Sequence, residues 1–329
     1  MPQWMAICIK KNRMKKQVTM CMLAALMLAA CGEDEPIAPP SGEVNQNSNA
    51  GLVSMGREAY VTEQPASTDC QQVAMRLEVP RLQGGTNNLL VVHTLQGGTV
   101  NYCMEYDCSL LASRWTAYRW YKGLSTNEAK WNRKNWESTS WHGDPFQEDP
   151  LLPKEYRTTL ADHSRNGYDR GHMLSSADRL NSQEANEQTF YLSNMHPQLA
   201  GFNWRGIWYN LEDRLQKVYD QDSFRDTLYV VKGGTIGRGQ YTLKNRLPVP
   251  KHFFMAILCK NGETTQGGYK AIAFWMEHKE NRDNDYASYA ISIDELERLT
   301  GIDFFCNLPD DIERQVESNL VLGAWGLNK

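Results

Sequence analysis

Several features that mark common protein classes are missing from this sequence. No apolar run reaches the ~20 residues that a helix needs to span a bilayer, since the segment Val18–Ala30 ends after roughly thirteen residues. No Cys-x-x-Cys pair and no internal repeat occur, which argues against a structural zinc site and against a repeat architecture. The 329 residues are 41% hydrophobic and 22% charged, a composition that fits one large or two modest globular domains.

Basic residues are also scarce outside the N-terminus. The full chain has 35 Lys and Arg against 39 Asp and Glu, a formal net charge of −4. Five of the basic residues lie within residues 1–30, which hold no acid, so residues 31–329 carry 30 basic against 39 acidic side chains, about −9. A protein that binds polyanions through its bulk charge usually has a basic surplus. Any activity on nucleic acid must therefore come from a local site.

The first thirty residues have the pattern of an export signal. Two lysines after Met14 are followed by the apolar run, which has the length of a signal-peptide core and ends in Leu-Ala-Ala-Cys31. This ending resembles the lipobox of bacterial lipoproteins, in which the cysteine is diacylated and becomes the mature N-terminus. We expect a signal peptide over residues 1–30, with Met14 as the true start and Cys31 as the lipid attachment site. An ordinary secretory signal with an unmodified cysteine is the alternative.

A lipid at Cys31 would place the protein in the cell envelope of a Gram-negative-type bacterium. We expect an outer-membrane lipoprotein that contacts the membrane through its anchor and is either periplasmic or surface-exposed. Residues 32–60 are rich in Pro, Ser, Asn, Gly and Glu, and such a segment cannot bury enough surface to offset its ordering entropy. The expected organisation is a flexible, lipid-anchored tether over residues 31–75 and one domain over residues 76–329.

The cysteines of the exported chain favour a few disulfides. Five remain besides Cys31, an odd number in an oxidising compartment. One or two disulfides are expected, formed among Cys70, Cys103 and Cys108.

Strand patterns dominate from about residue 76 onward. Short apolar or alternating runs are bounded by Gly-Gly pairs, as is typical of strands joined by tight turns. The expected strands are Asn88–Leu95, Val100–Tyr106, Arg114–Tyr121, Thr227–Lys232, His252–Lys260 and Lys270–Glu277.

Helical patterns are fewer and do not alternate regularly with the strands. Asn181–Leu192 and Ser292–Thr300 each begin with a polar residue that has Glu three positions on, the spacing of a capping box. A third helix is expected over Asn203–Tyr219, where one stripe of apolar residues recurs at helical spacing. The stripe consists of Ile207, Trp208, Leu211, Leu215 and Val218. Together these patterns predict a mixed α+β domain around a largely antiparallel sheet.

Side chains suited to phosphodiester chemistry gather in the middle of the chain. The tetrapeptide Asp-Arg-Gly-His at residues 169–172 is followed by Asn194 and then by Asn203, which opens the helix that carries Glu212. A histidine is a natural general base near neutral pH, an amide oxygen is a neutral ligand for Mg²⁺, and an arginine binds phosphate bidentately. A base, a hard-metal ligand and a phosphate clamp are what phosphodiester hydrolysis needs.

This set resembles the DNA/RNA non-specific endonuclease family, which has the ββα-metal fold and includes mitochondrial endonuclease G. The resemblance rests on the tetrapeptide, on Asn194 and the residues after it, and on Asn203 followed by Trp208 and Glu212, and it covers about residues 78–320. It implies a central, largely antiparallel sheet flanked by helices, and a Mg²⁺-dependent endonuclease for which Mn²⁺ could substitute. The substrates would be DNA and RNA with little sequence preference. Relatives are often dimers, so a homodimer is also expected.

The resemblance implies a role for each matching position. His172 would be the general base that deprotonates the attacking water, and Asn203 would be the sole direct protein ligand of the metal. Arg170 would contact phosphate or brace the site, and Arg133 would be the upstream residue that clamps the phosphate.

Three further residues would support these groups. Asp169 would support the loop of the tetrapeptide, and Asn194 would hold the loop or a metal-bound water. Glu212 would hydrogen-bond a water of the ion.

The chain departs from the family in the helix after the expected metal ligand. Asn203 and Glu212 are nine residues apart, where family members have eight, and the extra residue falls within Trp204–Ile207. Either Asn203 caps the helix from outside, or a π-bulge absorbs the insertion. Gln216 also stands where the family tends to have a basic residue, one turn after the glutamate.

A second hypothesis follows from that departure. If the insertion spoils the metal site, the chain would be a catalytically weakened surface lipoprotein that binds nucleic acid or glycan through tryptophan-rich loops. These loops contain Trp131, Trp136 and Trp141. The remaining loop histidines, which we interpret as ordinary polar residues, are His142, His163 and His196.

Overall fold

The computed structural model describes most of the expected domain and little of what precedes it. Outside the described part lie the expected signal peptide with Met14, the expected lipid site Cys31, most of the expected tether, and also Trp141 and His142. No helix in the described part is long and apolar enough to cross a membrane. The described residues are 45, 47–50, 70–138, 143–237, 241, 242, 244, 246–262 and 268–327.

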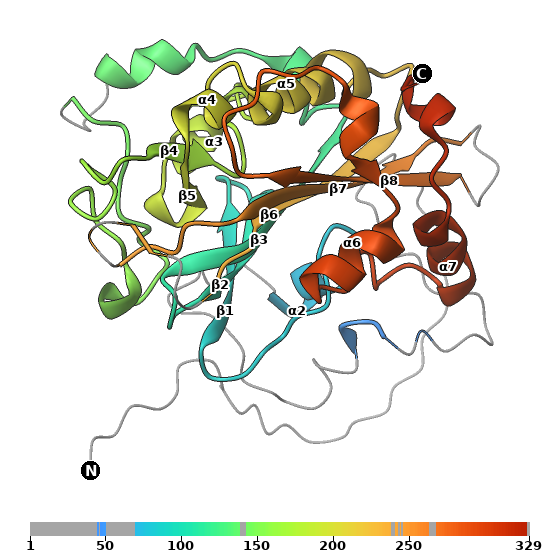
Figure 1. The fold of residues 1–329 in the computed structure, drawn as a ribbon, viewed down its shortest axis with the longest axis horizontal. Coiled ribbons are helices and arrows are strands. Elements are labelled where there is room, and N and C mark those ends of the chain that lie inside the picture. Colours follow the sequence, from blue (N-terminus) through green and yellow to red (C-terminus); the bar gives the residue numbers. More distant parts are fainter. Residues whose placement is uncertain are drawn as a thin grey trace, which may run out of the picture. The chain divides into compact units, whose positions relative to one another are not determined.

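Seven strands form one antiparallel sheet in the order β1-β2-β3-β6-β7-β8-β9 (Figure 1). Six of them match the predicted strands to within two residues, and the mixed α+β fold with a largely antiparallel sheet is confirmed. The seventh strand, β9, has only two residues, too few for an alternating pattern to reveal. The strands are β1 (Asn88–Thr94), β2 (Val100–Asp107), β3 (Ala112–Tyr121), β6 (Thr227–Gly234), β7 (His252–Lys260), β8 (Tyr269–Glu277) and β9 (Ala290–Ile291).

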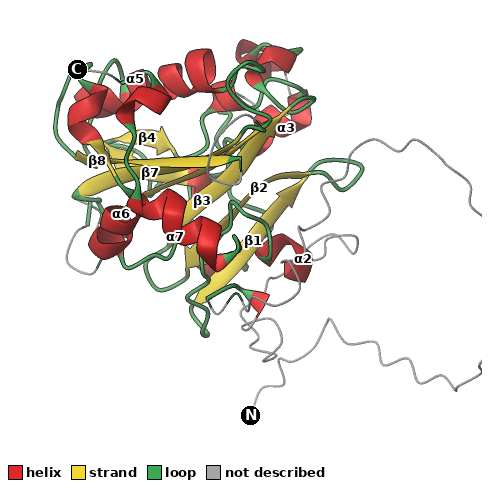
Figure 2. Cartoon of the chain, turned by 90° about the vertical axis from the view of Figure 1, so that its right-hand side faces the viewer, coloured by secondary structure: helices red, strands yellow, loops and turns green. Residues whose placement is uncertain are grey.

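The central strands are apolar along nearly their whole length because both faces of the sheet are buried. Side chains of Phe253, Met255 and Ile257 in β7 point to one face, and the residues between them point to the other. Helices cover the two faces separately (Figures 1 and 2). The first face packs against α4 (Ala200–Asn203) and α5 (Ile207–Arg214), and the second packs against α2 (Cys70–Ala74), α6 (Ile293–Thr300) and α7 (Asp310–Ser318).

One long connection between the neighbouring strands β3 and β6 carries the motif residues. It contains a two-stranded antiparallel pair in which Gly171 lies opposite His196, followed by α4 and α5 on the first face of the sheet. This succession of two strands and a helix is the arrangement that the resemblance implied. The connection contains β4 (Asp169–His172), α3 (Gln183–Gln188), β5 (Met195–Gln198), α4 and α5.

The capping signals locate two of the three predicted helices. Ser292 Oγ accepts a hydrogen bond from the backbone N–H of Glu295 at the start of α6, and Gly301 ends that helix with a φ of 68°. In α3 the capping residue is Ser182 rather than Asn181, and the helix ends at Gln188, earlier than expected.

The third prediction, one helix over Asn203–Tyr219, is wrong. The chain breaks after α4 and restarts at α5, which continues into a π-helical turn over Leu215–Tyr219. Because a π turn holds more residues than an α turn, it rotates the side chains that follow. Val218, expected on the buried stripe, is 39% exposed, and Tyr219 is buried in its place.

The expected disulfides are absent from the described part of the chain. Its five cysteines are free thiols, so the prediction of a bridge among Cys70, Cys103 and Cys108 is wrong. Cys103 packs on the second face of the sheet and Cys108 packs on the first, so their thiols cannot meet. Burial raises the pKa of Cys103 well above its usual range, which keeps that thiol protonated and unreactive.

A short stretch of the expected tether lies against the domain. Asn49 is fully buried, and its Nδ2 donates to the carbonyl oxygens of Ala74 and Pro80 while its Oδ1 accepts from the backbone N–H of Leu82. The packed part of the domain therefore includes residues upstream of 76, the boundary that composition indicated.

Candidate active site

The glycine of the tetrapeptide makes room for a side chain of the neighbouring strand. A Cβ added at Gly171 would lie 2.2 Å from the side chain of Gln198 on the paired strand β5. Gln198 is fully buried, so its side chain has no open space into which it could move. A side chain at position 171 would therefore collide with that of Gln198 unless the glutamine moved, and glycine avoids this collision.

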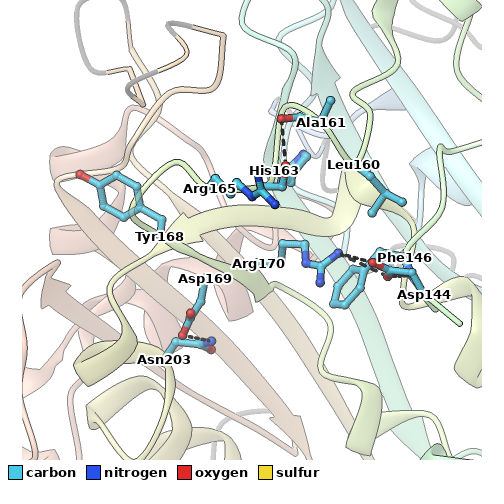
Figure 3. A pocket seen from close by; sticks show the side chains of 11 residues that line it. Asp144, Phe146, Leu160, Ala161, His163, Arg165, Tyr168, Asp169, Arg170 and Asn203 are labelled. Carbon is cyan, nitrogen blue, oxygen red and sulfur yellow. Dashed lines mark hydrogen bonds and ion pairs between the residues drawn. The ribbon is translucent and has the colours of Figure 1, made fainter.

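A cavity of about 600 Å³ lies beside β4 and the end of α4 (Figure 3). Three of the predicted site residues, Asp169, Arg170 and Asn203, line it together. The rest of the wall comes from the irregular segment before β4 and includes Asp144, Phe146 and His163.

Asn203 presents an amide oxygen to this cavity. Its Nδ2 donates to Asp169 Oδ2 over 3.3 Å (Figure 3). Among the described residues, Asn203 Oδ1 has no hydrogen-bond partner. An amide oxygen beside a carboxylate is a donor set that suits a hard divalent cation such as Mg²⁺. The residues present therefore fit the metal that the resemblance implies.

Arg170 is fixed in the cavity wall by two contacts. Its guanidinium carbon lies 3.8 Å from the centroid of the Phe146 ring, and its Nη1 is 3.2 Å from Asp144 Oδ2 (Figure 3). The side chain is still 31% exposed. A guanidinium held in place yet open to the cavity is suited to bind a phosphate oxygen.

His172 packs against two aromatic rings, one of which, Phe146, lines the cavity. Its ring centroid is 5.6 Å from that of Phe146 and 5.3 Å from that of Phe190. Burial, together with the positive charges of Arg133, Lys232 and Arg170, lowers the pKa of His172 to about 3. The ring atom Nε2 is buried and has no hydrogen-bond partner in the described part. The imidazole is therefore neutral at pH 7, as a general base must be.

Asn194 braces the loop that follows β4. Its Nδ2 donates to the carbonyl oxygens of Leu174 and Thr189, and its Oδ1 accepts from the backbone N–H of Leu174, each over 2.9 Å. These bonds use both amide hydrogens. Of the two expected roles, the geometry favours holding the loop over holding a metal-bound water.

A buried lysine lies beneath the site. Lys232 in β6 is fully buried, and its Nζ is 3.0 Å from Glu212 Oε1 and 3.6 Å from Asp178 Oδ2. Asp178 also accepts from the hydroxyl of Tyr118 over 2.8 Å and from Nε2 of Gln216 over 2.7 Å. One cation and two neutral donors thus hold two buried carboxylates together.

Burial and the lysine act on the pKa of Glu212 in opposite directions. Burial raises the pKa of Glu212, and the nearby charge of Asp178 adds to the rise, while Lys232 opposes it. Glu212 was expected to bind a water of the ion. The partner that the structure gives its carboxylate is Lys232.

Arg133 lies near both groups. It begins a 3-10 helix over Arg133–Ser138 and is exposed. Its positive charge lowers the pKa of His172 and also that of Glu212. The charge of Arg133 is thus felt at the expected base, while its side chain remains open to solvent.

Two histidines interpreted as loop residues are buried. His163 lines the cavity with its Nε2 3.0 Å from Thr158 Oγ1, and His196 has its Nε2 3.1 Å from Ser113 Oγ. Burial lowers the pKa of His163 to about 3 and that of His196 to about 4. Both are neutral at pH 7 and bonded to a hydroxyl group.

Four residues of the site region were missed by the sequence analysis. Lys232 had a local signal, because a lysine inside an otherwise apolar strand predicts a buried charged partner. The others lie in irregular segments whose approach to β4 and β6 depends on the tertiary fold. They are Asp144, Phe146 and Asp178.

A family model described as DNA/RNA non-specific endonuclease matches residues 86–311, which is more than half of the chain. The chain belongs to the DNA/RNA non-specific endonuclease family. Among its relatives is a nuclease of Nostoc sp., 32% identical over 67% of this chain and 76% of that protein. Mitochondrial nuclease 1 of Schizosaccharomyces pombe is 35% identical over 60% of this chain and 62% of its own length, and mitochondrial endonuclease G of Caenorhabditis elegans is 31% identical over 50% and 55%.

A solved structure supports the fold expected of a DNA/RNA non-specific endonuclease. The crystal structure of EndoG in complex with EndoGI matches with a TM-score of 0.58, covering 75% of this chain and 94% of that one at 23% identity. The predicted ββα-metal fold is confirmed.

In this member of the DNA/RNA non-specific endonuclease family, the extra residue lies in the break between α4 and α5. Trp204 follows α4, Arg205 has a φ of 62°, and Gly206 caps α5. A Cβ at Gly206 would lie 2.3 Å from a backbone carbonyl oxygen of α4, so the chain can return this tightly only through glycine. Neither expected explanation is right, because Asn203 ends one helix rather than capping another and the π turn comes after Glu212.

We expect Gly171→Ala to lower the free energy of unfolding by about 2 kcal/mol, because the added methyl group overpacks the contact with Gln198. Urea denaturation measures this cost. In a Gln198→Ala background the same substitution should cost less than ~0.5 kcal/mol, since the opposing side chain is gone. An equal cost in both backgrounds would show that the contact with Gln198 is not the constraint.

We expect Lys232→Met to lower the free energy of unfolding by about 3–5 kcal/mol, because it leaves two buried carboxylates without their cation. Adding Glu212→Gln should recover part of the loss by removing one of those charges. Urea midpoints at pH 7.5 provide the measurement, and exposed Lys217→Met is the matched control that leaves the midpoint nearly unchanged. Failure of Glu212→Gln to recover any stability would contradict the ion-pair account.

Proposed function

We propose that this chain is a metal-dependent endonuclease that hydrolyses the phosphodiester bonds of DNA and RNA with little sequence preference. The observation that carries the proposal is the cavity wall built by β4 and α4. There the guanidinium of Arg170 and the amide oxygen of Asn203 face one space, and His172 packs against the Phe146 ring of the same wall. These groups address the phosphate and not the base edges, which is consistent with the absence of sequence preference.

His172 is the general base in this proposal. Its imidazole is neutral at pH 7 and would take a proton from the attacking water at one of its ring nitrogens. The surrounding rings of Phe146 and Phe190 exclude bulk water and fix the plane of the imidazole. The cations Arg133, Arg170 and Lys232 keep the base unprotonated until the reaction supplies a proton.

Asn203 is the proposed metal ligand, with Asp169 orienting its amide. A bound Mg²⁺, or Mn²⁺ in its place, would stabilise the negative charge of the phosphate and of the leaving oxygen. Arg170 binds a phosphate oxygen from the cavity wall, and exposed Arg133 clamps the substrate from outside. Glu212 acts indirectly, by pairing with the buried cation Lys232 beneath the cavity.

The break after α4 supports hydrolysis over the alternative of a weakened binding protein. That alternative assumed that the extra residue distorts the helix carrying Glu212. The extra residue lies before α5, whose residues Ile207, Trp208 and Leu211 remain fully buried. The break also leaves Trp204 65% exposed directly after Asn203, where its ring offers bases a surface for stacking.

We also propose that Cys31 carries a lipid that anchors the protein to the outer membrane of a Gram-negative-type cell envelope, and that the protein works as a homodimer. The N-terminal sequence pattern supports the anchor, and the family resemblance supports the dimer.

Plasmid nicking with Mg²⁺ tests the activity. We expect His172→Ala to lower kcat/KM by about 10²–10⁴-fold, because proton transfer by a positioned base contributes that much. Asn203→Ala should abolish the rate advantage of Mg²⁺ over EDTA. His252→Ala, a half-buried histidine of β7 stacked on Trp275, is the matched control that retains activity. Mg²⁺-dependent nicking at the wild-type rate by His172→Ala would overturn the assignment of the base.

The pH dependence tests the electrostatics around the base. Activity needs neutral His172, so kcat/KM falls as pH drops through the pKa of that group, which lies below its usual 6.5. Arg133→Gln removes a positive charge, raises that pKa and should shift the acid limb of the pH–rate profile to higher pH. Lys134→Gln, a neighbouring exposed cation that does not act on His172, should leave the limb in place. An acid limb of the pH–rate profile that is unchanged in Arg133→Gln would show that Arg133 does not act on His172.

A further inference from the structure

Acidic side chains surround a second cavity, on the face of the sheet opposite the candidate active site. This cavity of about 310 Å³ lies between α6 and α7, which pack on the second face (Figures 1 and 2). Only Arg314 among its lining residues is basic. The acidic lining residues are Asp294, Glu297, Asp303, Asp310, Glu313 and Glu317.

Three of these carboxylates converge. Asp294 and Glu297 on α6 and Glu317 on α7 each have one oxygen within 4.8 Å of the others. Two oxygens bound to one Ca²⁺ at its usual 2.3–2.6 Å lie no more than ~5 Å apart. The three oxygens are therefore spaced as ligands of a single ion.

Glu317 gives an independent indication of a missing partner. Its side chain is only 5% exposed, and its Oε1 is buried and accepts no hydrogen bond from the described residues. Among the described residues, no ion pair joins Asp294, Glu297 or Glu317 to a basic side chain. A buried carboxylate oxygen without a donor costs free energy unless something else binds it.

The pKa values of the cluster show the size of this conflict. Burial, followed by the charges of neighbouring carboxylates, raises the pKa of Glu317 to about 10, and burial raises those of Glu297 to about 8 and Glu313 to about 7. These directions agree with the convergence of the three carboxylates and with the unpartnered oxygen of Glu317.

We propose that the cavity between α6 and α7 binds one Ca²⁺ ion, with Asp294, Glu297 and Glu317 as its protein ligands. The lining contains carboxylate and amide oxygens and no histidine or cysteine, which favours a hard cation over zinc. Larger, more flexible coordination suits Ca²⁺ better than Mg²⁺ where ligands come from two separate helices. The site is distinct from the catalytic one, because none of its residues lines the active-site cavity.

The N-terminal segment takes part in this site. Asn47 Nδ2 donates to Glu313 Oε1 over 2.7 Å and lies 3.4 Å from an oxygen of Asp303. The segment that precedes the domain is thereby bonded to the helices that would hold the ion. Neutralising the carboxylates would thus stabilise α6, α7 and the attachment of this segment together.

Calorimetric titration of the EDTA-treated full chain with CaCl₂ tests the proposal. Asn203→Ala serves as the background, so that the catalytic site does not contribute. We expect one bound Ca²⁺ with a Kd of ~10–1000 µM and a Tm higher by about 5 °C in excess Ca²⁺. Asp311→Asn, an exposed acid of α7 outside the cavity, should behave like its parent.

Glu317→Gln should abolish both the binding and the Tm shift. Without Ca²⁺ its Tm should equal or exceed that of the parent, because the amide stays neutral without binding either a proton or a cation. If Glu317→Gln does not fold, Asp294→Asn on the exposed rim should weaken Ca²⁺ at least tenfold. No Ca²⁺ binding by the parent, or undiminished binding in the tested variant, would overturn the site and leave a cluster held by protons. Neither result would bear on the nuclease activity.

Discussion

The contact between Gly171 and Gln198 sets the geometry on which the site depends. Because Gly171 leaves room for the buried side chain of Gln198, β4 pairs with β5 and holds Asp169, Arg170 and His172 along a strand of four residues. The strand β5 then leads almost directly into α4, so Asn203 arrives beside Asp169. Asn194 closes the arrangement by bonding the loop after the histidine. A pair of four-residue strands is thus enough to position the site residues.

Buried charges on the neighbouring strand β6 also act on the site. Lys232 is a fully buried cation between two carboxylates, and its charge also acts on His172. The family tends to place a basic residue on the helix, one turn after the glutamate. Here Gln216 occupies that position and donates to Asp178, while the positive charge comes from β6. In this chain the cation beside Glu212 therefore comes from a neighbouring strand and not from the helix.

The sequence predicted the sheet well, and three of the motif residues that it singled out, Asp169, Arg170 and Asn203, line one cavity. Alternating and continuous apolar runs located six strands, since burial of both sheet faces leaves a strong signal in residues such as those of β7. The prediction from sequence failed where one apolar pattern is compatible with two different structures. The apolar stripe after Asn203 fits one continuous helix, and only the tight return at Gly206 and the π turn, which follow from tertiary packing, divide it. Partners such as Phe146 and Asp144 for Arg170 come from an irregular segment, for which no periodicity exists.

The burial of Asn49 fixes where residues 47–50 join the domain. This residue bonds to Ala74 and Pro80, on the α2 side of the sheet, whereas the active-site cavity lies on the side of α4. With a lipid at the N-terminus, as proposed, the pull of the anchor would act on the rear of the molecule. Duplex DNA is stiff over about 50 nm, so a substrate entering from the front could lie across the cavity without colliding with the bilayer.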